Sequence, residues 1–381
     1  MQTTKHQKHA KLARPAAGHF GRREWAFMGA PCGGIHELFG DLVRELSPRY
    51  RLACMDADHH SQPEESGWLS GGANAVYTNK LEYHRLDRHD EPNAFQYREW
   101  FNDADAVLVN GNHFTAARQV LILDPRKFDS LSRKLDRLTQ VDLVLELPEE
   151  HPVPQAVLDH LGDRLKDIPR LRLDDRSGIA RWLSAQLESA IAPLKGLILA
   201  GGQSTRMGTD KSLLDYHGVP QRDYLYNMMD NLGLEPVLSV AAGQEIPGFR
   251  TIQDTFLGLG PMGAILSAFR EEPDTAWLVL ACDLPLVDEQ VLRVLIGNRR
   301  PSAAATAFRS PESGFPEPLA AIWEPRSYPV LFRFLSQGYS CPRKTLINSD
   351  THVIDPPTPE SMLNANKPEE MEAILKHYVG R

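Results

Sequence analysis

Twice in this chain, an apolar run ends in a glycine-rich turn that leads into helical or charged sequence. The first case is "WAFMGAPCGGIH" at residues 25–36, and the second is "LKGLILAGGQSTRMGTDKSLL" at residues 194–214. A buried strand that ends in bare backbone is typical of open α/β sheets, which bind ligands at the carboxyl ends of their strands. Because 381 residues suffice for two ordinary domains, the sequence predicts two α/β domains, each a mainly parallel sheet flanked by helices.

Composition limits the class of partner and the compartment. The net charge of −8, with both signs scattered, argues against nonspecific binding of nucleic acid. The four cysteines form no CxxC pair, which favours a reducing cytoplasm. No run of 18 apolar residues occurs, so we expect no membrane span. We expect the polar residues 1–20 to be disordered, with one domain at 21–192 and the other at 193–381.

The first half alternates strands and helices. Residues 24–28 predict a buried strand, and apolar side chains from Ile35 to Leu46 recur at helical spacing. Further strands are expected within 50–60, 103–114 and 134–147, and an amphipathic helix at 174–187 follows capping-type residues. The polar residues 61–100 are interpreted as insertions and short edge elements.

The first glycine turn lacks the groups that a phosphate-binding loop needs. Gly29 and Gly34 have the right separation, but Ile35 and His36 occupy the places of the lysine and the hydroxyl residue. The metal-directing carboxylate of such folds is replaced by Asn110. Because these groups hold the outer phosphates and magnesium, their loss predicts a domain that does not hydrolyse nucleotides.

A polar cluster ends the second predicted strand. It consists of Asp56, Asp58, His59 and His60. Neighbours on an extended segment point in opposite directions, which favours a simple polar exit from the strand. A divalent-ion site or a contact with a pterin remains the alternative.

The second glycine turn keeps its charged groups. Arg206 offers a planar fork of donors for phosphate, and Lys211 adds a compact positive charge. Asp283 follows the apolar run "WLVLA", where a carboxylate suits Mg²⁺ bound to a triphosphate. Asp254 ends another strand, where it could hold a ribose hydroxyl, join the metal or cap a loop. A surface turn and a capping aspartate are the structural alternatives for these motifs.

Residues 24–190 resemble the P-loop accessory protein of molybdenum-cofactor dinucleotide synthesis, usually called MobB. The resemblance rests on the strand, glycine loop and helix, on "DADAVLVNG", and on "HPVPQAVLDHL" with "DDRSGIARWLSAQL". That family has an intact GKT-type loop and an acidic residue before the glycine, and this chain has neither.

Residues 195–381 resemble the MobA group of nucleotidyltransferases, specifically the molybdenum cofactor guanylyltransferases. The matching pieces are "LAGGQSTRMGTDKSLL", "QDTFLGLGPMGAILSA", "LACDLPLV", "PEPLAAIWEP" and "NANKPEEM". The resemblance implies a Rossmann-like sheet, catalysis by Arg206, Lys211 and Asp283, Mg²⁺ on Asp283, and a pterin side at Asn364 and Asn366. It also implies a nucleotide site made of Leu199, Ala200, Gly201, Gly202, Lys211, Asp254 and Asp283.

Two departures from that family concern specificity. Ala241 and Ala242 stand where an asparagine often helps to hold guanosine, and Glu317 replaces the glutamine of Gln-Pro-Leu. The resemblance implies transfer of GMP from GTP to molybdopterin, with an accessory or docking role for the first domain. Molybdenum-insertion proteins or acceptor molybdoenzymes are the expected protein partners. Alternatives are a molybdopterin cytidylyltransferase, another nucleotidyltransferase of this fold, or a non-catalytic cofactor carrier.

Overall fold

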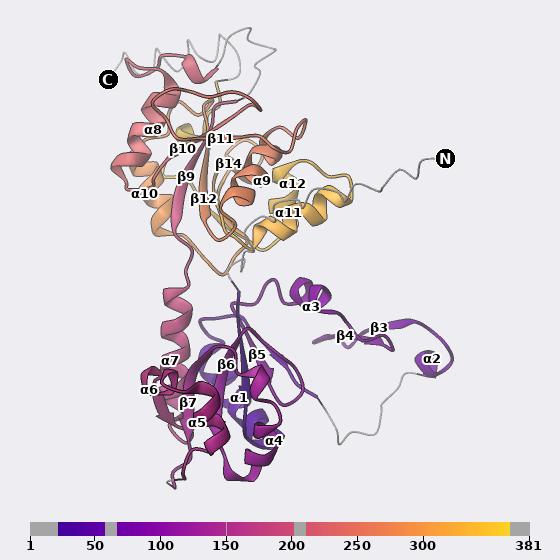
Figure 1. Cartoon of the computed structure of the whole chain (residues 1–381). Coiled ribbons are helices and arrows are strands. Elements are labelled where there is room, and N and C mark those ends of the chain that lie inside the picture. The colour runs from indigo at the N-terminus through magenta and orange to yellow at the C-terminus, as the bar shows by residue number, and fades with distance from the viewer. Residues whose placement is uncertain (1–21, 58–66, 150, 202–210, 366–381) are drawn as a thin grey trace, which may run out of the picture. The chain divides into compact units, whose positions relative to one another are not determined.

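The protein folds into two compact units, which span residues 22–190 and residues 191 onward (Figure 1). The computed structural model describes residues 22–57, 67–149, 151–201 and 211–365. Each unit has its own sheet and its own hydrophobic core, as the two glycine turns predict. None of the helices in these described ranges is long and apolar enough to cross a bilayer.

The first unit is built on a parallel sheet with the strand order β2-β5-β1-β6-β7-β8. Its strands are β1 (Arg23–Met28), β2 (Leu52–Met55), β5 (Ala106–Asn110), β6 (Arg118–Leu123), β7 (Val141–Glu146) and β8 (Arg170–Arg172). The central strands are buried on both faces, which explains their continuous apolar runs. This sheet confirms the α/β prediction for the first half.

Helices cover the two faces of this sheet. Side chains of α1 (Cys32–Leu46) and α7 (Arg176–Ser189) pack with β1 and β5 in one core cluster. A second cluster joins α4 (Phe128–Ser132), α5 (Gln155–Leu161) and α6 (Arg164–Asp167) to β6 and β7. Two short 3₁₀ helices, η1 (Pro125–Lys127) and η2 (Leu135–Arg137), flank α4.

The segment after residue 66 differs from its prediction. We expect insertions and short edge elements there; β3 (Ala75–Asn79) and β4 (His84–Arg88) are an insertion that forms a two-stranded sheet of its own and not an edge of the larger sheet. The flanking helices are α2 (Gly67–Ser70) and α3 (Ala94–Trp100). Asn93 caps α3, since its side chain accepts hydrogen bonds from the backbone of Phe95 and Gln96. Pattern alone does not reveal whether a hairpin joins a larger sheet.

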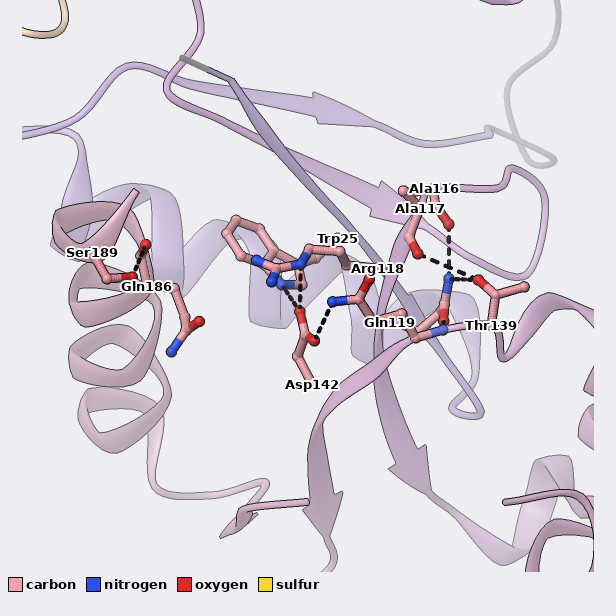
Figure 2. A network of polar contacts seen from close by, with 10 residues as sticks. Trp25, Ala116, Ala117, Arg118, Gln119, Thr139, Asp142, Gln186 and Ser189 are labelled. Atoms are coloured by element: carbon pink, nitrogen blue, oxygen red, sulfur yellow. Dashed lines mark hydrogen bonds and ion pairs between the residues drawn. The ribbon is translucent and has the colours of Figure 1, made fainter. Parts of the chain in front are cut away.

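Buried polar contacts tie β1, β6 and β7 together away from the glycine turn (Figure 2). Asp142 accepts a hydrogen bond from the Trp25 indole at 2.9 Å and pairs with Arg118 at 3.1 Å. Gln119, which is 1% exposed, donates to the Ala116 carbonyl and to the Thr139 hydroxyl. These contacts satisfy polar groups that burial would otherwise penalise, so they fix the register of the strands.

The second unit has a mixed sheet with the strand order β11-β10-β9-β12-β14-β13-β15. Its strands are β9 (Leu194–Leu199), β10 (Val237–Val240), β11 (Thr251–Gln253), β12 (Ala276–Ala281), β13 (Ala305–Arg309), β14 (Pro316–Trp323) and β15 (Thr351–Ile354). Only β14 runs antiparallel to its neighbours among these strands. The carboxyl ends of β11, β10, β9 and β12 therefore share one edge.

The helices of this unit also form two layers. One core cluster holds α8 (Gln221–Asn231) and α10 (Glu289–Gly297) against the sheet. The other holds α9 (Pro261–Glu271), α11 (Ser327–Ser336) and α12 (Pro342–Ile347), with Trp277 and Trp323 fully buried. Two 3₁₀ helices, η3 (Lys211–Leu213) and η4 (Pro359–Met362), lie in the connecting segments.

Candidate functional site

In the first unit, the glycine turn is short and runs directly into a helix. Helix α1 begins at Cys32, before Gly34, and the Ile35 N–H already donates to the Pro31 carbonyl at 3.1 Å. Gly29 has a φ of +97°, and a side chain there would meet the Ile122 carbonyl oxygen at 2.2 Å. Because α1 begins two residues before Gly34, the turn after Gly29 is shorter than the cradle that a P-loop wraps around phosphate.

Ile35 and His36, which replace the lysine and the hydroxyl residue of a P-loop, both contact other parts of the first unit. Ile35 is 0% exposed and lies in the core of the first unit. The His36 ring is exposed, with Nδ1 3.2 Å from a carboxylate oxygen of Asp56. Asn110 is fully buried and donates to the other Asp56 oxygen at 2.7 Å, while its own oxygen accepts the Asn112 N–H. The side chains of Asp56, Asn110 and Asn112 thus have partners inside the protein.

Asp56 lies at this edge, but the described residues do not make it a metal site. Partial burial alone would raise its pKa, but hydrogen bonds from Asn110, Ala57 and His36 hold the pKa below the ordinary value. No group of three or more candidate ligands occurs in the described ranges. Asp58, His59 and His60 lie outside those ranges, so the metal or pterin alternative for this cluster stays a prediction.

The second unit brings several of the sequence-predicted residues to one sheet edge. From β11 to β12, this edge carries Asp254, Ala241, Gly201 and Asp283 in spatial order. A side chain on Gly201 would lie 2.7 Å from the Ala241 nitrogen, so only glycine allows the chain to pass so close to β10. Gly202 and Arg206 lie outside the described residues, and their predicted roles stay predictions.

Lys211 and Asp283 meet at this edge although Asp283 lies 72 positions after Lys211 in the sequence. The Lys211 Nζ lies 3.6 Å from an Asp283 carboxylate oxygen, and both side chains are largely buried. Burial raises the pKa of Asp283, and the positive charge of Lys211 offsets part of that effect. A buried carboxylate with a cation beside it is suited to binding a metal–phosphate ligand.

Asp254 lies farther along the same edge. The Ser239 hydroxyl donates to its carboxylate at 3.2 Å, and burial raises the pKa of Asp254 despite this hydrogen bond. Strands β10 and β9 separate β11 from β12, which puts Asp254 about 14 Å from Asp283 at ordinary strand spacing. This spacing favours a contact of Asp254 with the ribose over a shared metal ion, and the role of Asp254 stays a prediction.

Glu317 faces Asp283 from the antiparallel neighbour. In the register of β12 and β14, Leu280 lies opposite Ala320; Asp283 follows the end of β12 and Glu317 lies at the start of β14, so both belong to the same end of this strand pair. Glu317 is 8% exposed and pairs with Arg343 at 2.7 Å. Burial raises the pKa of Glu317, Arg343 offsets part of this, and the charge of Asp283 raises it further. Sequence analysis noted Glu317 only as a departure from a family pattern, not as a neighbour of Asp283.

Other predicted residues surround this pair. The Ala365 N–H donates to the Asp283 carbonyl at 2.9 Å, so the half-buried Asn364 beside it lies near the loop after β12. Asn366 lies outside the described residues. Leu199 ends β9, and the Ala200 N–H donates to the Ser239 carbonyl at 3.0 Å, which continues the pairing of β9 with β10.

The residues at Asp283 fit a magnesium ion. Mg²⁺ is usually held by one or two carboxylates together with water and substrate phosphates. Asp283 and Glu317 would provide the carboxylates, and the buried Tyr216 hydroxyl near Asp283 is an orphaned polar atom, with no hydrogen-bond partner among the described residues. The negative charge of Asp283 helps to raise the pKa of Tyr216 to about 12, after the larger effect of burial.

Comparison with known proteins points to one family for this half of the chain. The family described as "MobA-like NTP transferase domain" matches residues 196–353. A "Probable molybdenum cofactor guanylyltransferase" of Nostoc is 31% identical over 193 residues, which cover 49% of this chain and 92% of that protein. The "Molybdenum cofactor biosynthesis bifunctional protein" of Synechocystis is 33% identical over 186 residues. That match covers 48% of this chain and spans about half, 54%, of the relative.

The first unit resembles MobB structures. The match to the MobB structure from Bacillus subtilis covers 42% of this chain and 96% of the MobB chain, with 13% identity and a TM-score of 0.33. The sequence matches establish the family, because the match to the Nostoc protein covers 92% of that protein at 31% identity. On those matches, and with Lys211 and Asp283 brought together at the sheet edge, the chain belongs to the MobA-like NTP transferase family.

Proposed function

We propose that the second unit transfers GMP from GTP to molybdopterin and releases pyrophosphate. The observation that carries the proposal is the pairing of Lys211 with the buried Asp283 beside the Gly201 turn. This arrangement supplies a cation, a metal-binding carboxylate and a close backbone approach at the ligand edge of a sheet. The names of the Nostoc and Synechocystis relatives support molybdenum-cofactor chemistry for this site.

The proposed reaction is a single displacement at phosphorus. An oxygen of the terminal phosphate of molybdopterin attacks the α-phosphorus of GTP and forms a new P–O bond. The bond from the α-phosphorus to the bridging oxygen breaks, and pyrophosphate leaves with the electron pair. No covalent enzyme intermediate is needed, so the protein contributes alignment and charge neutralisation.

Each residue has a distinct task in this reaction. Asp283, with Glu317 opposite, would hold Mg²⁺, which supplies positive charge to the triphosphate when bound. Lys211 binds phosphate oxygens, and Arg206 adds a bidentate donor in the same segment. Asp254, about 14 Å from Asp283, binds the nucleoside part of the substrate. Asn364 lies on the molybdopterin side.

The first unit has a supporting role in this proposal. Ile35 is in the core and Asn110 is fully hydrogen-bonded, so the groups that would hydrolyse a nucleotide are missing. We assign this unit to positioning molybdopterin or to docking a molybdenum-insertion protein or an acceptor molybdoenzyme, in the cytoplasm. This role predicts no phosphate release from GTP or ATP by the full chain.

The decisive experiment measures pyrophosphate release with each of the four ribonucleoside triphosphates, in the presence and absence of molybdopterin. We expect release with GTP that requires both molybdopterin and Mg²⁺. Preference for CTP would identify a cytidylyltransferase instead, which the alanines at 241 and 242 make the main competing specificity. No release with any triphosphate would contradict the proposal and favour a carrier of the cofactor.

A further inference from the structure

The hydroxyl of Tyr216 is a polar group for which the proposed transfer has so far given no use. Tyr216 is 8% exposed, and its hydroxyl is buried with no hydrogen-bond partner among the described residues. Leaving a buried donor unpaired costs free energy, so such groups in folded proteins generally have a partner in the protein, in water or in a ligand. For an unpaired hydroxyl next to a ligand site, the ligand is therefore a candidate for the missing hydrogen-bond partner.

Packing holds the Tyr216 ring against the loop that carries Asp283. The ring packs with Ala365, and Leu214 and Leu286 lie beside it. Ala365 in turn donates its N–H to the Asp283 carbonyl. One side of the ring is thus tied to the residues that flank Asp283.

His217, the next residue, also contacts the loop after β12. His217 Nε2 lies 3.0 Å from the Pro285 carbonyl, and its ring stacks on Tyr224 with centroids 3.7 Å apart. Gly218 and His217 also donate their N–H groups to the Asp215 carboxylate, which closes a tight turn. These contacts hold the segment that carries Tyr216 next to the loop after β12.

Its chemistry makes this hydroxyl a donor. A phenol has an ordinary pKa of about 10, so it keeps its proton at neutral pH and can donate a hydrogen bond. Lys211, 3.6 Å from Asp283, attracts anions to the same place. Phosphate oxygens are strong acceptors, and hydrogen bonds to charged acceptors are the stronger ones.

We propose that Tyr216 is a nucleotide-binding residue whose hydroxyl donates a hydrogen bond to a phosphate oxygen held beside Lys211 and Asp283. This inference rests on the proposed function, because it requires that a nucleoside triphosphate binds at this edge. It adds a residue from the segment between η3 and α8 to the phosphate site.

The test compares two matched variants of the full chain. Tyr216→Phe removes only the hydroxyl, and Tyr226→Phe makes the same change on α8, where Tyr226 packs edge-on against Phe249. Calorimetric titrations would measure the Kd of GTP and of inorganic pyrophosphate, each with Mg²⁺ and without molybdopterin. We expect Tyr216→Phe to weaken both ligands about 10- to 100-fold, as for one hydrogen bond to a charged group, and Tyr226→Phe to change neither more than about twofold.

Thermal unfolding of the ligand-free proteins supplies the second measurement. If the hydroxyl waits for a ligand, removing it should leave the Tm unchanged or raise it. A clear fall in the ligand-free Tm would overturn the inference, because it would show that the hydroxyl has a structural partner. An affinity within about twofold of wild type for either ligand would overturn it as well.

The wild-type protein separates this failure from that of the proposed function. If wild type binds GTP and only the Tyr216→Phe result disagrees, the assignment of Tyr216 is wrong and the transferase proposal stands. If wild type binds neither GTP nor pyrophosphate, the proposed function fails and the role of Tyr216 fails with it.

Discussion

The two glycine turns of this protein start from the same pattern and reach opposite results. After β1, the chain passes Gly29 and enters α1 within a few residues, and the side chain of Ile35 is buried in the core. After β9, the chain passes Gly201 and returns at η3 with Lys211 beside Asp283. A strand that ends in glycine can therefore form a ligand edge in one unit and lead into a buried helix in the other.

The surrounding carboxylates strengthen this difference. In the first unit, Asp56 accepts a hydrogen bond from Asn110, and its other carboxylate oxygen lies 3.2 Å from the His36 ring. In the second unit, Asp283 and Glu317 are buried close to each other, and burial raises the pKa of both. Buried carboxylates that lie close together favour a bound cation, whereas a satisfied carboxylate does not. The following predictions test this contrast.

Restoring the missing lysine in the first turn should unfold the first unit rather than create a phosphate site. Ile35→Lys would bury an unpaired charge at a position that is 0% exposed, at a cost of about 3–5 kcal/mol. Gly34→Lys is the matched control, because a side chain there meets nothing within 4 Å. Calorimetry should show the loss for Ile35→Lys alone. A stable Ile35→Lys protein that hydrolyses GTP would break the contrast between the two turns.

Removing the lysine of the second turn should have the next largest effect. Lys211→Ala takes away one preorganised positive charge, so the rate of pyrophosphate release should fall about 10²-fold. Lys195→Ala is the control, since Lys195 lies at the opposite end of β9 and pairs with Glu235 and Glu272. Steady-state kinetics with GTP and molybdopterin would compare them. Near-normal turnover of Lys211→Ala would remove this residue from the site.

The substitution Glu317→Gln should cause a smaller change, which is a weaker affinity of the protein for Mg²⁺. The charge of Asp283 acts on the pKa of Glu317, so the two carboxylates are close, and removing the charge of Glu317 should weaken Mg²⁺ binding about 10-fold. The measurements are Mn²⁺ titration by electron paramagnetic resonance and the Mg²⁺ dependence of the rate. Glu312→Gln, at an exposed position before β14, is the control. Identical metal affinity for Glu317→Gln and wild type would show that Asp283 acts without its neighbour.

The smallest predicted effect is on stability as pH changes. The pKa of Asp283 is raised above the ordinary 3.8, so the stability contribution of this group is present below that value and is lost as pH rises through the raised pKa. The Tm of Asp283→Asn should therefore equal that of wild type near pH 4 and exceed it at pH 7. The expected difference is about 2–4 °C for each kcal/mol that burial of the charged carboxylate costs the wild-type protein. Differential scanning calorimetry would measure both.

The control for this comparison is Asp230→Asn, which neutralises an exposed carboxylate on α8 and should change the Tm by about 1 °C or less. A wild-type protein that is more stable than Asp283→Asn at pH 7 would mean that the pair with Lys211 outweighs the cost of burial. In that case Asp283 would be a structural ion-pair residue in the ligand-free protein.

Much of the fold could be predicted because parallel strands are buried on both faces. The apolar runs at β1, β9 and β12 are continuous, so they indicate buried strands without knowledge of their partners. Sequence analysis named no strand at residues 118–123, although β6 lies beside β1. An apolar run of that length is ambiguous by periodicity alone. The separate hairpin of β3 and β4 was equally beyond local pattern.

For the second turn, the sequence by itself determined which groups were available: glycines after a buried strand, Lys211, and carboxylates placed where strands end. The tertiary structure decided which of them meet. Asp254 and Asp283 both follow strands, but the sheet order puts two strands between them. Glu317 and Tyr216 come near Asp283 because β14 pairs with β12 and because Tyr216 packs with Ala365. Strand order and register depend on contacts between distant segments, and local pattern carries no information about those contacts.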